Sequence, residues 1–75
     1  MTGASDPKID TATFASSNLA SGTYDSKNRV MQIVFSRTSA VYEWQNVPPD
    51  AWESLKAAHS PGSFLHANFG PGEPI

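Results

Sequence analysis

The sequence predicts an α+β fold, in which a three-stranded antiparallel β-meander packs against one α-helix and a short second helix or turn follows. Two observations predict the sheet: apolar and polar residues alternate between residues 18 and 44, and short polar turns interrupt the alternation. Short turns of this kind join antiparallel neighbours. A third observation marks the end of the sheet, because Pro48 and Pro49 directly precede an amphipathic segment.

The first strand is expected at residues 18–24 and the second at residues 29–35. The first is weak by propensity, because it contains Gly22 and several small residues. The turn between them, residues 25–28, contains Asp and Asn, whose side chains can bond to their own backbone. The second strand has a more apolar face that should point to the core, formed by Met31, Ile33 and Phe35.

The third strand is expected at residues 40–44, with Tyr42 and Trp44 on one face. Because Trp44 lies at the end of the sheet, it is expected to be half-exposed. One helix can cover only one face of the sheet, so the other face should stay uncovered. That uncovered face would carry Val30, Gln32, Val34, Val41 and Glu43. Its apolar members favour a partner or a covering segment.

The helix is expected at residues 49–59. Its first residue is a proline, whose missing N–H would be unpaired at that position anyway. Glu53 and Lys56 should point to solvent. The face that should pack on the sheet includes Trp52, Leu55 and His59. The sequence Ser-Pro-Gly at residues 60–62 ends the helix, and a second short segment follows at residues 63–69.

These elements divide the chain into a central domain at residues 15–69 and two flanking segments. Residues 1–14 are small and polar and are expected to form an N-terminal arm. Residues 70–75 are rich in Gly and Pro and are expected to form an extended tail without regular structure.

Composition excludes several classes of protein. The chain has 75 residues, which is enough for one small domain, and it has no cysteine for a disulfide, a zinc thiolate or a thiol nucleophile. Its formal net charge is −2 and its five basic residues are scattered, whereas nucleic-acid binders usually carry a basic stripe. No run is long and apolar enough to span a membrane, and no classical signal peptide is visible.

Candidate catalytic chemistry is sparse. His59 and His66 could be considered as metal ligands, but Pro61 and Gly62 separate them and no carboxylate lies at ligand spacing. There is no nucleophile elbow, no glycine-rich phosphate loop and no recognisable carboxylate pair. We therefore expect no catalytic residue, no metal site, no cofactor and no small-molecule substrate.

Several short motifs resemble those of a known family. They include S-S-N-L-A-S-x-x-Y-D at residues 16–25, V-Y-E-W at residues 41–44, V-P-P at residues 47–49 and F-L-H at residues 64–66. In this order and spacing they resemble the KTSC domain, a family named for its similarity to a C-terminal segment of some lysyl-tRNA synthetases. The family also occurs as short stand-alone proteins in bacteria and phages. The resemblance implies an α+β fold and no established enzymatic activity.

The chain departs from the family pattern at three places. Gly22 stands where relatives often have a hydrophobic residue, and Leu65-His66 stands where they usually have Phe-Asn. Residues 70–75 replace a basic, aromatic tail that is common in relatives. Because this chain lacks the basic tail, the resemblance gives less support to a role in nucleic-acid binding.

We therefore expect a non-enzymatic structural or interaction module, most naturally a small subunit of a larger assembly such as a phage virion, as a capsid or tail accessory protein. It would be intracellular in a bacterial host or associated with the virion. Its partners would be proteins, with a homo-oligomer as an open option. The alternative is a small RNA- or DNA-binding module, favoured by the synthetase link and by the number of aromatic residues. The residues expected to contact a partner are Ile9, Val30, Val34, Val41, Trp44 and Ile75.

Overall fold

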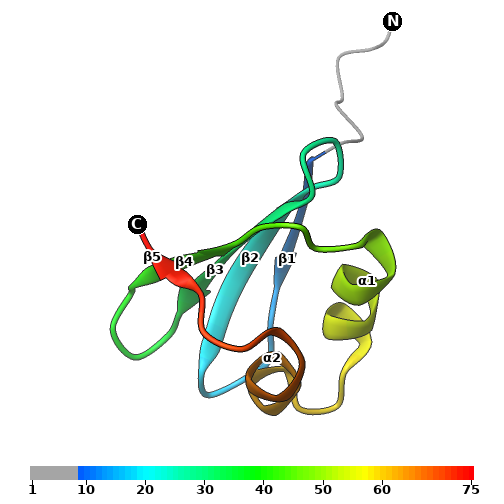
Figure 1. Cartoon of the computed structure of the whole chain (residues 1–75). Coiled ribbons are helices and arrows are strands. Elements are labelled where there is room, and N and C mark those ends of the chain that lie inside the picture. Colours follow the sequence, from blue (N-terminus) through cyan, green and yellow to red (C-terminus); the bar gives the residue numbers. More distant parts are fainter. Residues whose placement is uncertain (1–8) are drawn as a thin grey trace, which may run out of the picture.

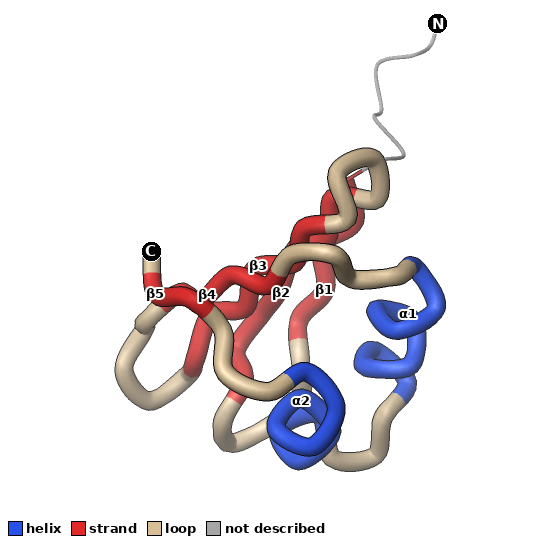
Figure 2. Tube along the Cα trace, viewed as in Figure 1, coloured by secondary structure: helices blue, strands red, loops and turns tan. Residues whose placement is uncertain are grey.

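A computed structural model describes residues 9–75 as one antiparallel sheet with two helices (Figure 1). The strand order follows the chain, β1-β2-β3-β4-β5. Both helices lie on the same side of the sheet, and no other element of residues 9–75 covers the opposite face (Figure 2). The elements are β1 (Ile9–Thr13), β2 (Leu19–Asp25), β3 (Val30–Phe35), β4 (Val41–Trp44), α1 (Pro49–Ala57), α2 (Pro61–Phe69) and β5 (Glu73–Pro74).

The α+β class, the antiparallel sheet and the second helix are confirmed, but the expectation of three strands is wrong. The three expected strands correspond to β2, β3 and β4, which form the centre of the sheet. The additional strands, β1 and β5, are its two edges. They come from the segments that were expected to be an irregular arm and an irregular tail. The expected arm also includes residues 1–8, which lie outside the described residues.

Strand β1 forms because the edge of β2 supplies a hydrogen-bonding partner along its whole length. The register runs from Ile9 opposite Asp25 to Thr13 opposite Ser21. On the helix side, Ala12 packs against the core and Asp10 bonds to α1. An edge strand needs little apolar area of its own. A polar sequence can therefore form one when it can pair with β2 and also contact the helix side.

Strand β5 pairs with β4 at Tyr42 and Glu43, and Trp44, the last residue of β4, holds the segment that leads into it. The indole Nε1–H of Trp44 donates a hydrogen bond of 3.1 Å to the carbonyl of Gly70, and the backbone N–H of Ile75 donates one of 3.0 Å to Val41. Pro74 is tolerated because a proline that lacks an N–H can sit on an edge strand. The tail therefore covers Trp44, which is only 8% exposed, and the expectation of a half-exposed Trp44 is wrong.

The first helix begins at Pro49 as expected but ends at Ala57, two residues early. Ala58 is already extended, with φ −66° and ψ 139°. Pro61 begins α2 and disfavours a helical conformation at the residue before it, which separates the two helices. His59, expected on the buried face of the helix, therefore lies in the connection and is exposed.

The core lies between the sheet and the helices and is centred on Trp52, which is 1% exposed. The Trp52 ring stacks on Tyr24 at 5.6 Å between centroids, and Phe14 meets it edge-on at 6.4 Å. Met31 and Ile33 are fully buried, as their spacing predicts, and Phe35 packs at the margin. The buried apolar residues are Leu19, Tyr24, Met31, Ile33, Trp44, Val47, Trp52, Leu55 and Leu65.

One buried hydrogen bond ties β2 to the loop before α1. The hydroxyl of Tyr24 donates to the carbonyl of Val47, and burial raises the pKa of this hydroxyl, so it stays protonated as a donor. Tyr24→Phe would leave the buried carbonyl without this donor and should lower the free energy of unfolding by about 1–2 kcal/mol. Urea unfolding would measure the change.

The matched control for that variant is Tyr42→Phe. The hydroxyl of Tyr42 makes no hydrogen bond within residues 9–75, so its removal should change the urea midpoint little. Equal effects of the two substitutions would show that the bond from Tyr24 to Val47 contributes nothing specific.

Candidate functional site

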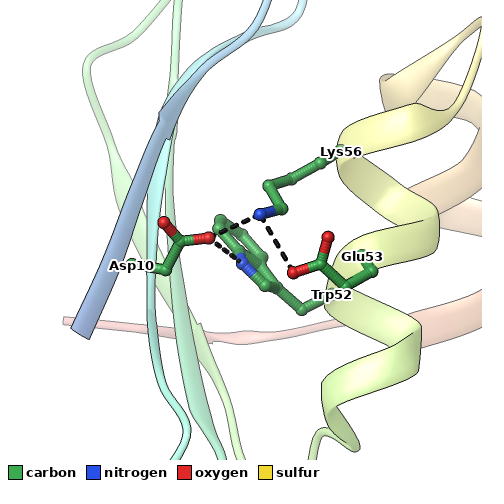
Figure 3. A network of polar contacts seen from close by, with 4 residues as sticks. All are labelled: Asp10, Trp52, Glu53 and Lys56. Atoms are coloured by element: carbon green, nitrogen blue, oxygen red, sulfur yellow. Dashed lines mark hydrogen bonds and ion pairs between the residues drawn. The ribbon is translucent and has the colours of Figure 1, made fainter. Parts of the chain in front are cut away.

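A polar network joins the edge strand β1 to helix α1 (Figure 3). One carboxylate oxygen of Asp10 accepts hydrogen bonds from the Nε1–H of Trp52, at 2.8 Å, and from the ammonium group of Lys56. Lys56 also forms an ion pair with Glu53 at 3.0 Å, and its Nζ lies 5.5 Å from the centroid of the Trp52 ring. Lys56 was expected to point to solvent, but the strand β1 that the sequence did not predict gives it a partner.

The electrostatics of this network suit a structural role. The hydrogen bond from Lys56 is the main cause that lowers the pKa of Asp10, with a smaller contribution from Trp52. The hydrogen bond to Asp10 is likewise the main cause that raises the pKa of Lys56. A general acid and an amine nucleophile need pKa shifts in the opposite directions, so these shifts do not prepare Asp10 as a general acid or Lys56 as a nucleophile.

The network predicts a small dependence of stability on acid pH. Because the pKa of Asp10 lies below its ordinary value of 3.8 in the folded chain, its contribution is complete above pH 3.8 and is lost as the pH falls below that value. Asp10→Asn should remove this contribution, which is at most about 1 kcal/mol for a largely solvated pair. The difference between wild type and variant in urea unfolding should shrink from pH 6 to pH 2; a constant difference would contradict the prediction.

The face of the sheet opposite the helices is the main uncovered surface of the described residues, and we call it the open face. Directly paired residues of an antiparallel sheet lie on the same face, so the register defines its members. They are Ile9, Thr11, Thr13, Ser21, Thr23, Asp25, Val30, Gln32, Val34, Val41, Glu43, Glu73 and Ile75.

Apolar side chains form two groups on the open face. Val34 is paired with Val41, and the continuing register places Ile75 beside Val41. At the opposite end of the strands, Ile9 and Val30 flank Asp25 across three strands. Ile9 is 50% exposed and Ile75 is 69% exposed. Five of the six residues expected to contact a partner thus lie on this one face; Trp44, on the other face, does not.

The charged side chains of the open face are all acidic. Asp25, Glu43 and Glu73 belong to it, and none of its members is Lys, Arg or His. Glu43 accepts hydrogen bonds from Gln32 at 3.1 Å and from Gln45 at 3.3 Å, which orients its carboxyl group. Glu73 lies directly opposite Glu43. A hydrogen bond from Asn28 is the main cause that lowers the pKa of Asp25.

A cleft of about 740 Å³ lies on the helix side, between the end of the β3–β4 hairpin, α2 and the tail. The sequence did not predict it, because the tail that forms one wall was expected to be irregular. The residues that line it are Asn18, Phe35, Arg37, Thr38, Tyr42, Trp44, Gly62, Ser63, Leu65, His66, Gly70, Pro71 and Gly72. His66, one of the two histidines considered as metal ligands, lines this cleft.

Residues 9–75 contain neither a cluster of metal-ligand side chains nor a membrane-spanning helix. No group of three or more His, Asp or Glu side chains comes close enough there to hold a metal ion. No helix in this part of the chain is long and apolar enough to cross a membrane.

The fold places this chain in the class of small α+β domains that have both helices on one face of an antiparallel sheet. The sequence pattern of the KTSC domain family matches residues 15–71, so the chain belongs to the KTSC domain family. It is also similar to the crystal structure of a KTSC domain protein from Yersinia pestis, with a TM-score of 0.77 and 26% identity. That similarity covers 89% of this chain and 94% of the other. No curated protein matched the sequence.

These comparisons confirm the resemblance seen in the motifs. They also explain one failure of the sequence-based expectations. The edge strands β1 and β5 lie outside the residues that match the family pattern, so the family motifs carried no information about them.

Proposed function

We propose that this chain is a non-enzymatic interaction module that binds a protein partner through its open face. One observation carries the proposal: apolar and acidic side chains share a sheet face that nothing within residues 9–75 covers. Exposed aliphatic groups rimmed by polar residues are characteristic of surfaces that bind other proteins. The two small clusters of Val and Ile would supply apolar contact, and the carboxyl groups would select the partner.

The charge of the face determines the chemistry of the partner. Complementary charges across an interface raise the association rate and suppress wrong partners. Among residues 9–75 this face carries Asp25, Glu43 and Glu73 and no Lys or Arg, so it favours a surface that presents Lys or Arg between aliphatic side chains. A strand or a sheet face with alternating aliphatic and basic residues has this chemistry, because its side chains alternate with the same period of two.

A second copy of this chain fits the open face less well. Two copies packed through this face would both contribute acidic side chains, and no basic side chain of residues 9–75 would neutralise them. Like charges at an interface are unfavourable when they are desolvated. If the chain forms the homo-oligomer that the sequence analysis left open, the copies would therefore have to meet through another surface.

The proposal can be tested by titrating the isotope-labelled protein with a peptide that alternates valine and lysine, followed by amide chemical shifts. We expect shifts on β2, β3 and β4 and a much weaker response to a peptide that alternates valine and glutamate. Exchanging Glu43→Gln and Glu73→Gln together should weaken binding by about tenfold or more, because two charge contacts are lost. Val41→Thr should weaken it by removing one aliphatic contact.

The matched control is Glu53→Gln, which removes a carboxyl group on the helix side of the protein and should leave peptide affinity unchanged. Equal affinity for the lysine and glutamate peptides would contradict the proposal. So would shifts centred on the helices.

A nucleic-acid-binding module is the alternative function. It is favoured by the aromatic and basic side chains that meet at the cleft, where Phe35 and Tyr42 lie near Arg37. It is disfavoured because Lys27 and Arg29 lie in a different turn and Lys56 is paired with acids. A single-stranded oligonucleotide of mixed sequence, titrated at low and high salt, tests it, because phosphate binding must weaken as salt increases.

Association with a virion, and a bacterial host cell as the site of action, stay predictions that rest on where the KTSC family occurs. Cross-linking of the protein within purified particles, with a photoreactive side chain at Val34, would test them. A cross-link to a coat or tail protein is the expected result.

A further inference from the structure

The cleft on the helix side has a composition that the open face lacks. Its lining includes Phe35 and Tyr42, which are partly buried and pack against the core, together with the buried Leu65. The Phe35 and Tyr42 rings meet edge-on, with centroids 5.4 Å apart and planes at 80°. Each ring therefore contributes a differently oriented aromatic surface to the cleft, and both rings pack against the buried core. Small-molecule sites are typically apolar clefts of about 300–1,000 Å³ with few polar groups.

The polar groups of the cleft are basic or neutral. Arg37 and His66 line it, and no Asp or Glu does, although the chain has more acidic than basic residues. Arg37 is exposed and forms no ion pair or hydrogen bond within residues 9–75. By contrast, Lys56 is engaged by Asp10 and Glu53. The guanidinium of Arg37 is therefore available to an anion, and a planar guanidinium matches the two oxygens of a carboxylate or phosphate.

The tail makes the cleft a defined site. Gly70 has a φ of 69° and presents its carbonyl to the indole of Trp44. Gly72 lies against the Trp44 ring so closely that an added Cβ would be 2.7 Å from two ring atoms. These contacts hold residues 70–72 in place as part of the lining that they share with Arg37. The site exists only when the tail is in place.

From these observations we propose that the cleft binds a small anion with a planar aromatic ring, the ring lying over Phe35 and Tyr42 and the anionic group at Arg37. Two kinds of molecule share this chemistry: aryl carboxylates and nucleoside monophosphates. Both combine a flat ring that can contact aromatic side chains with a group that a guanidinium can bind through two hydrogen bonds. This site is on the other side of the sheet from the open face and is independent of it.

The test uses three probes with the same ring and different charge: indole-3-acetate, indole-3-acetamide and tryptamine. Each is titrated into the labelled full-length chain, and the indole N–H resonance of Trp44 and the amides of residues 66–72 are followed. We expect saturable shifts with the anion, weaker shifts with the neutral amide and none with the amine. Adenosine monophosphate forms a fourth arm that distinguishes a nucleotide from an aryl carboxylate.

Two variants connect the binding to the residues. Arg37→Gln should weaken the anion by about tenfold and bring it close to the neutral amide, because one charge-assisted contact is removed. Lys27→Gln removes an equal charge from the β2–β3 turn, outside the cleft, and should leave the affinity unchanged. The amide spectra of both variants without probe show whether each keeps the fold.

Tighter binding of the anion than of the neutral amide, weakened in Arg37→Gln and retained in Lys27→Gln, supports the site. Binding of adenosine monophosphate in place of indole-3-acetate supports it with a nucleotide as the ligand. Equal binding of indole-3-acetate and tryptamine would overturn it. So would shifts outside the cleft, equal affinities of the two variants, or no binding of either anion.

Discussion

Replacing Trp52 with alanine should remove a large part of the stability of the isolated chain. Trp52 is 1% exposed, stacks on Tyr24, meets Phe14 edge-on and donates a hydrogen bond to Asp10. Truncation of a buried Trp costs about 3–5 kcal/mol through lost burial and the cavity that remains. Small domains have a stability of about 0.05–0.15 kcal/mol per residue, which is about 4–11 kcal/mol for 75 residues, so the substitution removes at least about a quarter of it. Circular dichroism with urea titration would measure the loss.

Trp52→Phe separates packing from the polar contact. A phenyl ring keeps much of the buried area and the aromatic contact with Tyr24, but it cannot donate to Asp10. We expect a folded protein with a lower urea midpoint and a less protected strand β1 in amide exchange. A Trp52→Ala variant with the midpoint of the wild type would contradict the central place of this residue in the core.

Replacing Gly72 with alanine should release the tail from the sheet. The added Cβ would lie 2.7 Å from Cε2 and Cζ2 of Trp44 and 2.9 Å from Cδ2, and a flat, buried indole cannot move aside easily. Residues 70–75 must shift instead, which breaks the bonds from Trp44 to Gly70 and from Ile75 to Val41. Overpacking of this kind costs about 1–3 kcal/mol.

The release can be observed directly. The indole N–H resonance of Trp44 should move, the amide of Ile75 should exchange faster, and the aromatic anions proposed for the cleft should lose affinity. Glu73→Ala is the matched control, because its exposed side chain lies on the open face and does not contact the Trp44 ring. An unchanged Trp44 resonance in Gly72→Ala would show that the tail is not held by this contact.

The central strands and the first helix could be predicted because their signals are local. The alternation at Met31, Ile33 and Phe35 identifies a strand and its buried face without knowledge of any partner. The double proline identifies the start of α1 for a similar reason, since proline is acceptable at the first helical position. The open face followed from the same alternation, so Val30, Val34 and Val41 were placed on it correctly.

The edge strands and Trp44 could not be predicted because their signals are not local. Strand β1 depends on the free edge of β2 and on an ion pair with Lys56, which is 46 residues away in sequence from Asp10. The burial of Trp44 depends on Gly70 and Gly72, which a local pattern classifies as loop residues. The cleft depends on the same tail, so it was missed together with β5.

The sequence by itself determined the fold class, the family and the side chains of the central sheet, because periodicity and turn chemistry act between near neighbours. Only the tertiary structure decided the width of the sheet, the burial of Trp44 and the existence of the cleft. Each of these depends on polar segments that have no apolar pattern of their own. They become ordered when a sheet edge, an indole N–H or an ammonium group far away in sequence satisfies their backbone or side-chain hydrogen bonds.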